Sequence, residues 1–408
     1  MPGTEAVLFF LSLLVIGLFL EPLAARARIP VSVLLVPLGF GASELATRVA
    51  GLDLGIRWDN LGPFITYVIV PSLIFESALR LDIDALRRDA IAVILLAFPL
   101  LLLAAGITAC VAYFSIGHPV GFPWAVALLA GAILCSTEMT GMFNLLLGAG
   151  APKRITWILE GEGIFNDTAA ILLFTLLLSV ALMGDQAVSA TGVGIGFLRL
   201  FLGGIAVGCI CGFIARAILR RMPGDHAFAV LSFATAYGVF LFAQKFLQVS
   251  GALAVLTAGS LLCSDLRRNR QVGSFPEELW KFVAHIAGAM VFILAGVSIT
   301  LGMFQDQWLA MLVGIAAVFV ARLVIVFGLL GPVSHLPGGQ ALSIAGQTVL
   351  VWGSVRGSVA MALVLSLPLE LEPWYTVQTL VYGAVLFSLF VQATTVSRLV
   401  ARLRFPAT

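Results

Sequence analysis

The chain has 408 residues, of which 61% are hydrophobic and 11% are charged, and its mean hydropathy is +1.09. Soluble domains carry roughly 25% charged residues and about 45–50% apolar ones, so this composition excludes a soluble globular protein and predicts a polytopic membrane protein. The formal net charge of +2 is too small to favour a nucleic acid as a partner.

Apolar runs separated by charged or Gly/Pro-containing breaks predict thirteen transmembrane helices in chain order. A span needs about 20 apolar residues. The first run lacks the basic start and small-residue exit of a cleaved signal peptide, so it is expected to be a helix. The predicted ranges are 6–25, 30–47, 61–80, 90–115, 123–148, 155–183, 193–219, 227–246, 250–264, 279–303, 307–331, 341–367 and 375–400.

The distribution of Lys and Arg predicts the orientation. Sixteen of these residues lie in loops after odd-numbered helices or in the C-terminal tail, and only Arg48, Arg57 and Lys245 follow even-numbered helices. Because cytoplasmic loops attract the positive excess, we expect the N-terminus outside and the C-terminus in the cytoplasm. One helix more or fewer would break this alternation, which supports the count of thirteen.

An odd number of spans fits two six-helix halves of opposite topology, with the seventh helix as the link between them. Helix 5 contains a polar break from Cys135 to Gly141, and its counterpart in the second half, helix 12, contains another from Gly353 to Ser358. Matching interruptions indicate a substrate site, because unwound backbone supplies free carbonyl groups and helix ends. The expected fold is an all-α bundle of inverted repeats with two unwound crossing helices.

Helix 6 is almost wholly apolar but contains three carboxylates, those of Glu160, Glu162 and Asp167. An ionisable side chain at that depth costs at least about 2.5–3.5 kcal/mol on insertion scales, so it usually marks an ion or proton pathway. Hydrocarbon surroundings favour a neutral acid and a bound cation favours an ionised one, so a single residue can exchange a proton for a cation. Asp167, with Asn166 beside it, is the candidate. Pairing with buried arginines is the alternative, and for Glu162 it is the favoured one.

Two arginines, Arg322 in helix 11 and Arg356 in helix 12, lie deep in their spans and need compensation. Glu160 and Glu162 are the expected partners, in structural ion pairs that fix the broken helix. An anion substrate held by Arg356 is the alternative.

The break in helix 5 also carries hard oxygen ligands, from Thr137, Glu138 and opened backbone carbonyls. We therefore expect a sodium site at Asp167, Glu138 and Thr137, with capping of half-helix amides as the alternative role of Glu138. In helix 3, Glu76 lies four residues before Arg80, so it either forms a local ion pair or lines the ion path. No phosphate loop, nucleophile triad or metal cluster appears, so neither an enzyme nor a cofactor is expected.

The segments Pro71–Asp82, Pro152–Phe174 and Trp352–Pro368 resemble motifs of the Na⁺/H⁺ exchangers of the monovalent cation–proton antiporter family, in its NhaP-like branch. The resemblance covers essentially the whole chain. It implies that the helix 6 aspartate is the exchanging carboxylate and that the helix 3 glutamate belongs to the ion site. The residues that match the family's motifs are Asp167 with Asn166, Glu76, and Trp352, Gly353, Arg356 and Gly357.

The resemblance further implies a secondary antiporter that exchanges Na⁺ (or Li⁺ or K⁺) for H⁺ by alternating access and serves pH homeostasis. Since Asn166 stands in place of a second acid, one-for-one, electroneutral exchange is expected. Residues 1–408 are expected to form one transmembrane domain, with helices 4–6 and 11–13 as the moving core and helices 1–3 and 7–10 as the scaffold. A homodimer in the bacterial inner membrane is implied. A passive cation or proton channel on the same fold is the alternative.

Two departures from the family's pattern concern the transported ion. The usual Thr-Asp-Pro of helix 5 is Thr137-Glu138-Met139 here, so the acid has a longer arm and the proline is missing. The usual Glu-Gly-Glu-Ser of helix 6 ends in Gly163, so a serine hydroxyl is absent. These changes bear on which cation is bound rather than on the type of reaction.

Overall fold

The computed structural model describes residues 2–27, 29–48, 58–81, 99–117, 122–138, 141–183, 189–222, 224–268, 275–334, 342–403 and 405. These residues form helices and contain no strand, which confirms the all-α class. Within them, seven helices are long and apolar enough to cross a membrane, and four shorter apolar helices accompany these. The chain is a multi-pass membrane protein.

The first half of the chain forms helices at the predicted places, although residues 90–98 of the fourth predicted span lie outside the described residues. Their bounds are α1 (Pro2–Ala27), α2 (Ser32–Arg48), α3 (Trp58–Phe64), the π-helical turn η1 (Ile65–Ile69), α4 (Val70–Arg80), α7 (Pro99–Ser115), α8 (Trp124–Cys135), α9 (Met142–Gly148), α10 (Lys153–Leu182) and α11 (Ala190–Arg221). α3, η1 and α4 continue one another as a single span. The wide turn η1 precedes Pro71, which has no N–H group to complete a regular helical ladder.

The second half also follows the prediction, with one exception. Its elements are α12 (Asp225–Phe233), η2 (Ala234–Val239), η3 (Phe242–Phe246), α13 (Gly251–Arg268), α14 (Phe275–Ser298), α15 (Leu301–Asp306), α16 (Trp308–Leu323), η4 (Val324–Leu330), α17 (Gly331–Ser334), α18 (Ile344–Trp352), α19 (Ser358–Leu365), α20 (Trp374–Phe387), η5 (Ser388–Ala393) and α21 (Thr394–Leu403). The predicted span 279–303 is wrong at its end. The β-branched Thr300 is extended (φ −119°, ψ 151°), so the helix stops and α15 begins separately.

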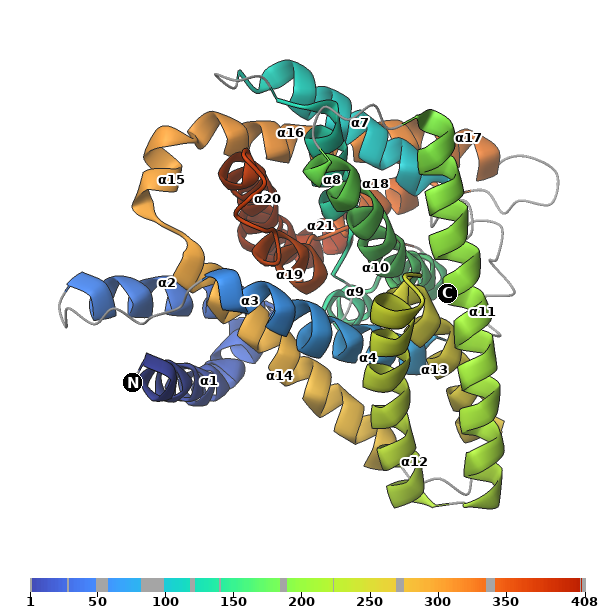
Figure 1. The fold of residues 1–408 in the computed structure, drawn as a ribbon. Coiled ribbons are helices and arrows are strands. Elements are labelled where there is room, and N and C mark those ends of the chain that lie inside the picture. Colours follow the sequence, from blue (N-terminus) through green and yellow to red (C-terminus); the bar gives the residue numbers. More distant parts are fainter. Residues whose placement is uncertain are drawn as a thin grey trace.

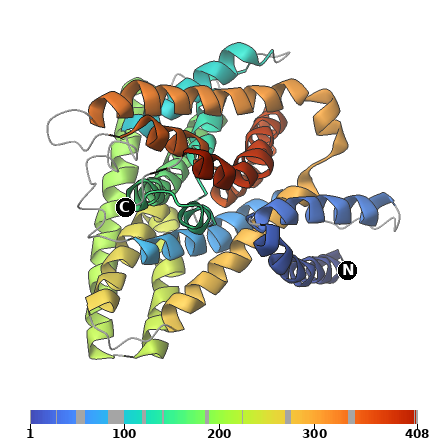
Figure 2. The same ribbon diagram turned by 180° about the vertical axis from the view of Figure 1, so that it is seen from behind.

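The helices pack in two groups. In one, α11 lies along α13, α13 contacts α4, and α14 packs against α2 and α4. In the other, α7 packs against α8 and α16, α8 against α10, and α16 against α20. Helix α11 forms one edge of the molecule, and α1 and α2 lie at the opposite edge (Figures 1 and 2). Contacts of α10 with α4 and α13, and of α14 with α19, join the two groups.

Two glycines show how closely the helices approach within each group. A Cβ at Gly208 in α11 would lie 2.6 Å from the carbonyl oxygen of Ala254 in α13. A Cβ at Gly314 in α16 would overlap the carbonyl group of Leu380 in α20. Small residues at such crossings allow the backbone contact on which helix association in a membrane depends.

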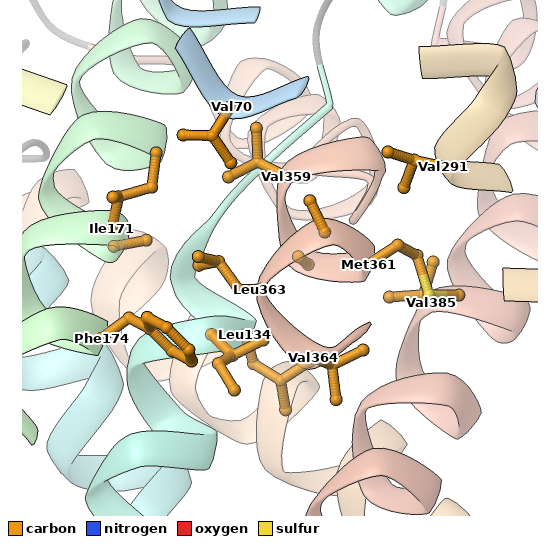
Figure 3. Packing of buried hydrophobic residues seen from close by; sticks show 14 of the residues in the cluster. Val70, Leu134, Ile171, Phe174, Val291, Val359, Met361, Leu363, Val364 and Val385 are labelled. Carbon is orange, nitrogen blue, oxygen red and sulfur yellow. The ribbon is translucent and has the colours of Figure 1, made fainter. Parts of the chain in front are cut away.

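Helix α19 lies at the centre of the bundle, and each of its eight residues is buried. Its apolar side chains face several neighbouring helices at once (Figure 3). A helix that is apolar on all sides is stable only when it is surrounded by other elements. The labelled residues around it are Val70 of α4, Leu134 of α8, Ile171 and Phe174 of α10, Val291 of α14 and Val385 of α20. This packing fixes the N-terminus of α19 in the interior.

Candidate functional site

Both helices that the sequence predicts to be interrupted are broken, between α8 and α9 and between α18 and α19. The two unwound segments are in contact, because the N–H of Glu138 donates a hydrogen bond of 2.7 Å to the carbonyl of Val355. This bond satisfies two backbone groups that have left their helices, as a chain inside a membrane requires. The predicted pair of unwound crossing helices is confirmed.

Asp167, in α10, lies against the unwound segment that follows α8. Its Oδ1 accepts hydrogen bonds from the hydroxyl of Ser136 at 2.7 Å and from the N–H of Thr137 at 3.2 Å. Within the described part of the chain, no hydrogen bond reaches the other oxygen, Oδ2. The residue is only partly buried. An aspartate held through one oxygen can therefore offer the second to a proton or a cation.

Glu138 caps the N-terminus of α19. Its Oε2 accepts hydrogen bonds from the N–H of Ser358 at 2.9 Å and from the hydroxyl of the same residue at 2.5 Å. An anion is favourable there because the helix dipole presents its positive end. A Cβ at Gly357 would overlap the Glu138 side chain, so the glycine is required for this contact. Of the two roles expected for Glu138, the capping contact is therefore present in the structure.

A cavity of about 330 Å³ lies beside the crossing. Four of the expected site residues line it, namely Glu76, Thr137, Glu138 and Asp167. Gly163, one helical turn before the aspartate, also lines it. The hydroxyl oxygen of Thr137 is buried and has no hydrogen-bond partner among the described residues. The cavity thus brings together carboxylates and a hydroxyl, the oxygen ligands that hard cations prefer.

The cavity extends to the surface at the start of α14, where Lys281 and His285 line it. Their side chains are 56% and 48% exposed. Each is paired with an acid on the surface, Lys281 with Glu277 at 2.8 Å and His285 with Glu21 at 2.7 Å. The cavity therefore connects exposed side chains of α14 with the buried carboxylates.

Glu76 and Arg80 form the ion pair that their spacing allows, with 2.7 Å between Oε1 and Nε. Glu76 is also buried and lines the cavity, so the local ion pair does not remove it from the place where the second expected role would put it. Arg80 lies 3.8 Å from Glu160 Oε1, which links α4 to α10. The partner expected for Glu160 was a deeper arginine. Glu160 faces α4 instead. Residues two apart on a helix point about 200° apart, so Glu162 faces away from α4, toward Arg322 of α16.

Glu162 and Arg322 form the expected buried ion pair. The guanidinium binds the carboxylate through two nitrogens, Nη1 to Oε1 and Nη2 to Oε2, the latter at 2.7 Å. Arg322 also donates from Nε and Nη2 to the carbonyl of Leu350 at 3.3 and 3.1 Å. The amide of Asn166 donates to Glu162 Oε1 at 3.0 Å. The structure thus places Asn166 in this cluster and not among the residues that line the cavity of about 330 Å³.

The expectation that Arg356 pairs with a glutamate is wrong. The Nη1 of Arg356 donates to the carbonyl oxygens of Cys135 at 3.0 Å and Ser136 at 3.1 Å. In the described part of the chain, no carboxylate lies within ion-pair distance of it. The open C-terminus of α8 has carbonyl groups without helical partners, and the negative end of the helix dipole favours a cation there. Arg356 therefore fixes the segment that holds Asp167.

Two contacts of the candidate site come from residues that the sequence analysis did not single out, Ser136 and Ser358. The first binds Asp167 and the second binds Glu138. Both serines stand inside the predicted breaks, so a hydroxyl group in an unwound segment was the signal that could have found them.

Two broken helices that cross in a membrane bundle, beside a cavity lined by carboxylates, define the class of secondary transporters built on inverted repeats. A family profile described as "Sodium/hydrogen exchanger, transmembrane" matches residues 10–402. The chain therefore belongs to the sodium/hydrogen exchanger family, which consists of transporters and not of enzymes.

Individual relatives agree with this assignment. The chain is 33% identical to the Na⁺/H⁺ antiporter ApNhaP of Aphanothece halophytica, over 92% of this chain and 70% of the relative. It is 31% identical to the low-affinity Na⁺/H⁺ antiporter NhaS1 of Synechocystis, over 90% of this chain and 68% of the relative. The structure of the sodium proton antiporter MjNhaP1 from Methanocaldococcus jannaschii superposes with a TM-score of 0.83 at 20% identity, covering 99% of each chain. That last similarity shows the fold.

Proposed function

We propose that the chain is a secondary antiporter that exchanges Na⁺ for H⁺ by alternating access. Membership of the sodium/hydrogen exchanger family and the names of the two cyanobacterial relatives support the reaction. The observation that carries the proposal is the geometry of Asp167, which is held through one oxygen at the helix crossing and lines a cavity that extends to the surface. Li⁺ and K⁺ are the other candidate cations.

Asp167 binds either a proton or a cation, and never both. A protonated acid has no charge to offer a cation, and a bound cation keeps the acid ionised, so each ion displaces the other. The flows of the two ions are coupled in this way. Asn166 carries no charge, and its amide is bound to Glu162 in the buried cluster. Of the neighbouring residues Asn166 and Asp167, only Asp167 therefore takes up and releases a proton at the site. One proton is then exchanged for one cation, and no net charge is moved.

We assign the bound cation to Asp167, Thr137 and Glu138. The buried hydroxyl of Thr137 supports this assignment, because a buried polar atom without a partner costs about 1–3 kcal/mol and a cation would satisfy it. Glu138 contributes negative charge from the N-terminus of α19. Glu76 lines the route to the site. Gly163 lines the cavity at the position where the family carries a serine, and in this proposal a water molecule takes the place of the missing hydroxyl. No cofactor is needed beyond the transported ions.

The moving core would consist of helices 4–6 and 11–13, and the scaffold of helices 1–3 and 7–10. The packing supports this division within a single transmembrane domain, because α7, α8, α10, α16 and α20 contact one another, as do α2, α4, α11, α13 and α14. The ion cavity lies where the two groups meet, since α10 and α19 belong to one and α4 and α14 to the other. Movement of the core would carry Asp167 from one side of the membrane to the other.

The Lys/Arg asymmetry supports an N-terminus outside and a C-terminus in the cytoplasm. Since Arg80 and Lys281 lie at the predicted cytoplasmic ends of their spans, the cavity would then open to the cytoplasm. Bacterial relatives support the inner membrane as the location. A homodimer is the assembly that the family fold implies.

An anion carrier built on Arg356 is disfavoured by position. Its guanidinium is bound to the carbonyl groups that end α8, and it is not among the residues that line the ion cavity. A passive channel on this fold differs from an antiporter in that its two ion flows are not coupled.

Purified protein in vesicles with a trapped pH dye tests the proposal. Pulses of Na⁺, Li⁺ and K⁺ over a pH series should drive saturable proton movement that persists when the membrane potential is clamped at zero. Asp167→Asn should abolish it. Glu278→Gln makes the same chemical change at an exposed position of α14 and should leave it intact. Proton movement that does not saturate, or that does not require the cation, would support the channel and contradict the proposal.

A further inference from the structure

A second, smaller cavity lies inside the bundle between α7, α8, α10 and α16. Its volume is about 20 Å³, and no residue lines both this cavity and the larger one. A water molecule needs at least about 10–15 Å³ of such space, so one water fits and a larger ligand does not. The polar residues that line the cavity are Cys135, Glu162, Asn166, Arg322 and Arg356.

Two of these side chains carry a buried polar atom without a hydrogen-bond partner among the described residues. They are the Nε–H of Arg356, which can only donate, and the Oδ1 of Asn166, which can only accept. The amide of Asn166 is oriented by Glu162, because a carboxylate can accept only from the NH₂ side. Both residues are about 95% buried, at 5% and 4% exposure. Buried polar groups of this kind normally bind a partner.

The chemistry of the two atoms selects the ligand. An anion could accept from Arg356 but could not donate to Asn166. A metal cation could bind the oxygen of Asn166 but would be repelled by Arg322 and Arg356. A water molecule both donates and accepts, so it alone among these ligands satisfies both atoms.

We propose that this cavity binds one structural water molecule that bridges Arg356 Nε to Asn166 Oδ1. The water joins Arg356 to the cluster of Glu162 and Arg322. It thereby holds the guanidinium on the carbonyl groups of Cys135 and Ser136, which orients the segment that binds Asp167. The water is a positioning element, and the cavity that holds it shares no lining residue with the larger cavity.

A density map of the wild-type protein at about 2 Å resolution tests the site directly. We expect one peak within about 2.7–3.2 Å of both Arg356 Nε and Asn166 Oδ1. A map that resolves other buried waters but has no peak here overturns the proposal. So does a peak that contacts neither atom.

A pair of matched variants on α16 tests the positioning role. Ala321 lines the cavity, whereas Ala317, one turn earlier, is fully buried elsewhere. Ala321→Val should fill the space, remove the peak and lower the apparent cation affinity by roughly tenfold, as loss of an outer-shell partner does. Ala317→Val adds the same two carbons and should change the affinity by less than about twofold.

Equal losses in both variants, or unchanged affinity in Ala321→Val once the peak is gone, would show that the water does not position the site. A monodisperse elution profile confirms that each variant is folded. The affinity comparison rests on the proposed function. The density map of the wild-type protein does not depend on the proposed function. A protein that fails to transport would contradict the antiporter proposal, and the density would still decide whether the water is bound.

Discussion

The buried pair of Glu162 and Arg322 allows a stability prediction from the structure. Arg322→Met removes the charge and keeps an unbranched side chain. It leaves Glu162, which is 1% exposed, with the amide of Asn166 as its one hydrogen-bond donor in the described part of the chain. Breaking a buried pair in this way costs about 3–5 kcal/mol, because an uncompensated charge remains. At about 2.1 cal/mol/K of unfolding entropy per residue over 408 residues, the apparent Tm should fall by about 4–6 °C.

Thermal unfolding in detergent, followed by tryptophan fluorescence, measures this loss. The double variant Arg322→Met, Glu162→Gln carries neither charge and should recover more than half of the loss, since the remaining groups are neutral. Glu162→Gln alone supplies the fourth corner of the cycle. Additive losses in the double variant would refute the reasoning, because they would show that the two charges do not stabilise each other.

Three further variants test other contacts of the site and of the packing. Ser136→Ala removes a donor that favours the ionised form of Asp167. A hydrogen bond to a charged group contributes about 1.5–3 kcal/mol, so the apparent cation affinity in vesicles should fall by about 10- to 150-fold; unchanged affinity would contradict this role. Glu138→Ala should destabilise the protein by about 0.5–2 kcal/mol through the lost helix cap, and Glu138→Gln by less than half of that; equal losses would argue against a cap. Gly314→Leu should lower the Tm by about 1–4 °C through about 1–3 kcal/mol of overpacking, whereas Gly328→Leu, with open space around its Cβ, should not; similar Tm values for both would contradict the close crossing of α16 and α20.

The positions of the helices and of both breaks were predictable because their signals are local. Apolar runs long enough to span a membrane stand out in the composition. The breaks carry glycines and polar side chains in a row, as at Gly353–Ser358. The end of the tenth span was missed because the extended conformation of Thr300 interrupts an otherwise apolar run.

The partners of the charged residues were harder to predict, because they depend on how neighbouring helices are rotated. Glu160 and Glu162 are adjacent in the sequence pattern but face α4 and α16 respectively. Arg356 was expected to need a carboxylate. The C-terminal end of α8 supplies carbonyl groups instead. The periodicity of the sequence does not show whether a buried arginine binds a carboxylate or the carbonyl groups at a helix end. The position of Asn166 also depends on helix rotation. It is rotated by about 100° from its neighbour Asp167, so it faces the buried cluster while Asp167 faces the larger cavity.

The central claim is that a single carboxylate, that of Asp167, carries the proton and the cation in turn. The most direct test measures the apparent KM for Na⁺ in vesicles as a function of pH, for the wild type and for Asp167→Asn. One-for-one competition predicts that, on the acid side of the profile, the wild-type KM for Na⁺ rises by about tenfold for each unit by which the pH falls. It also predicts that the variant shows no Na⁺-driven proton movement at any pH. A KM that does not depend on pH, or Na⁺-driven proton movement that persists in Asp167→Asn, would contradict it.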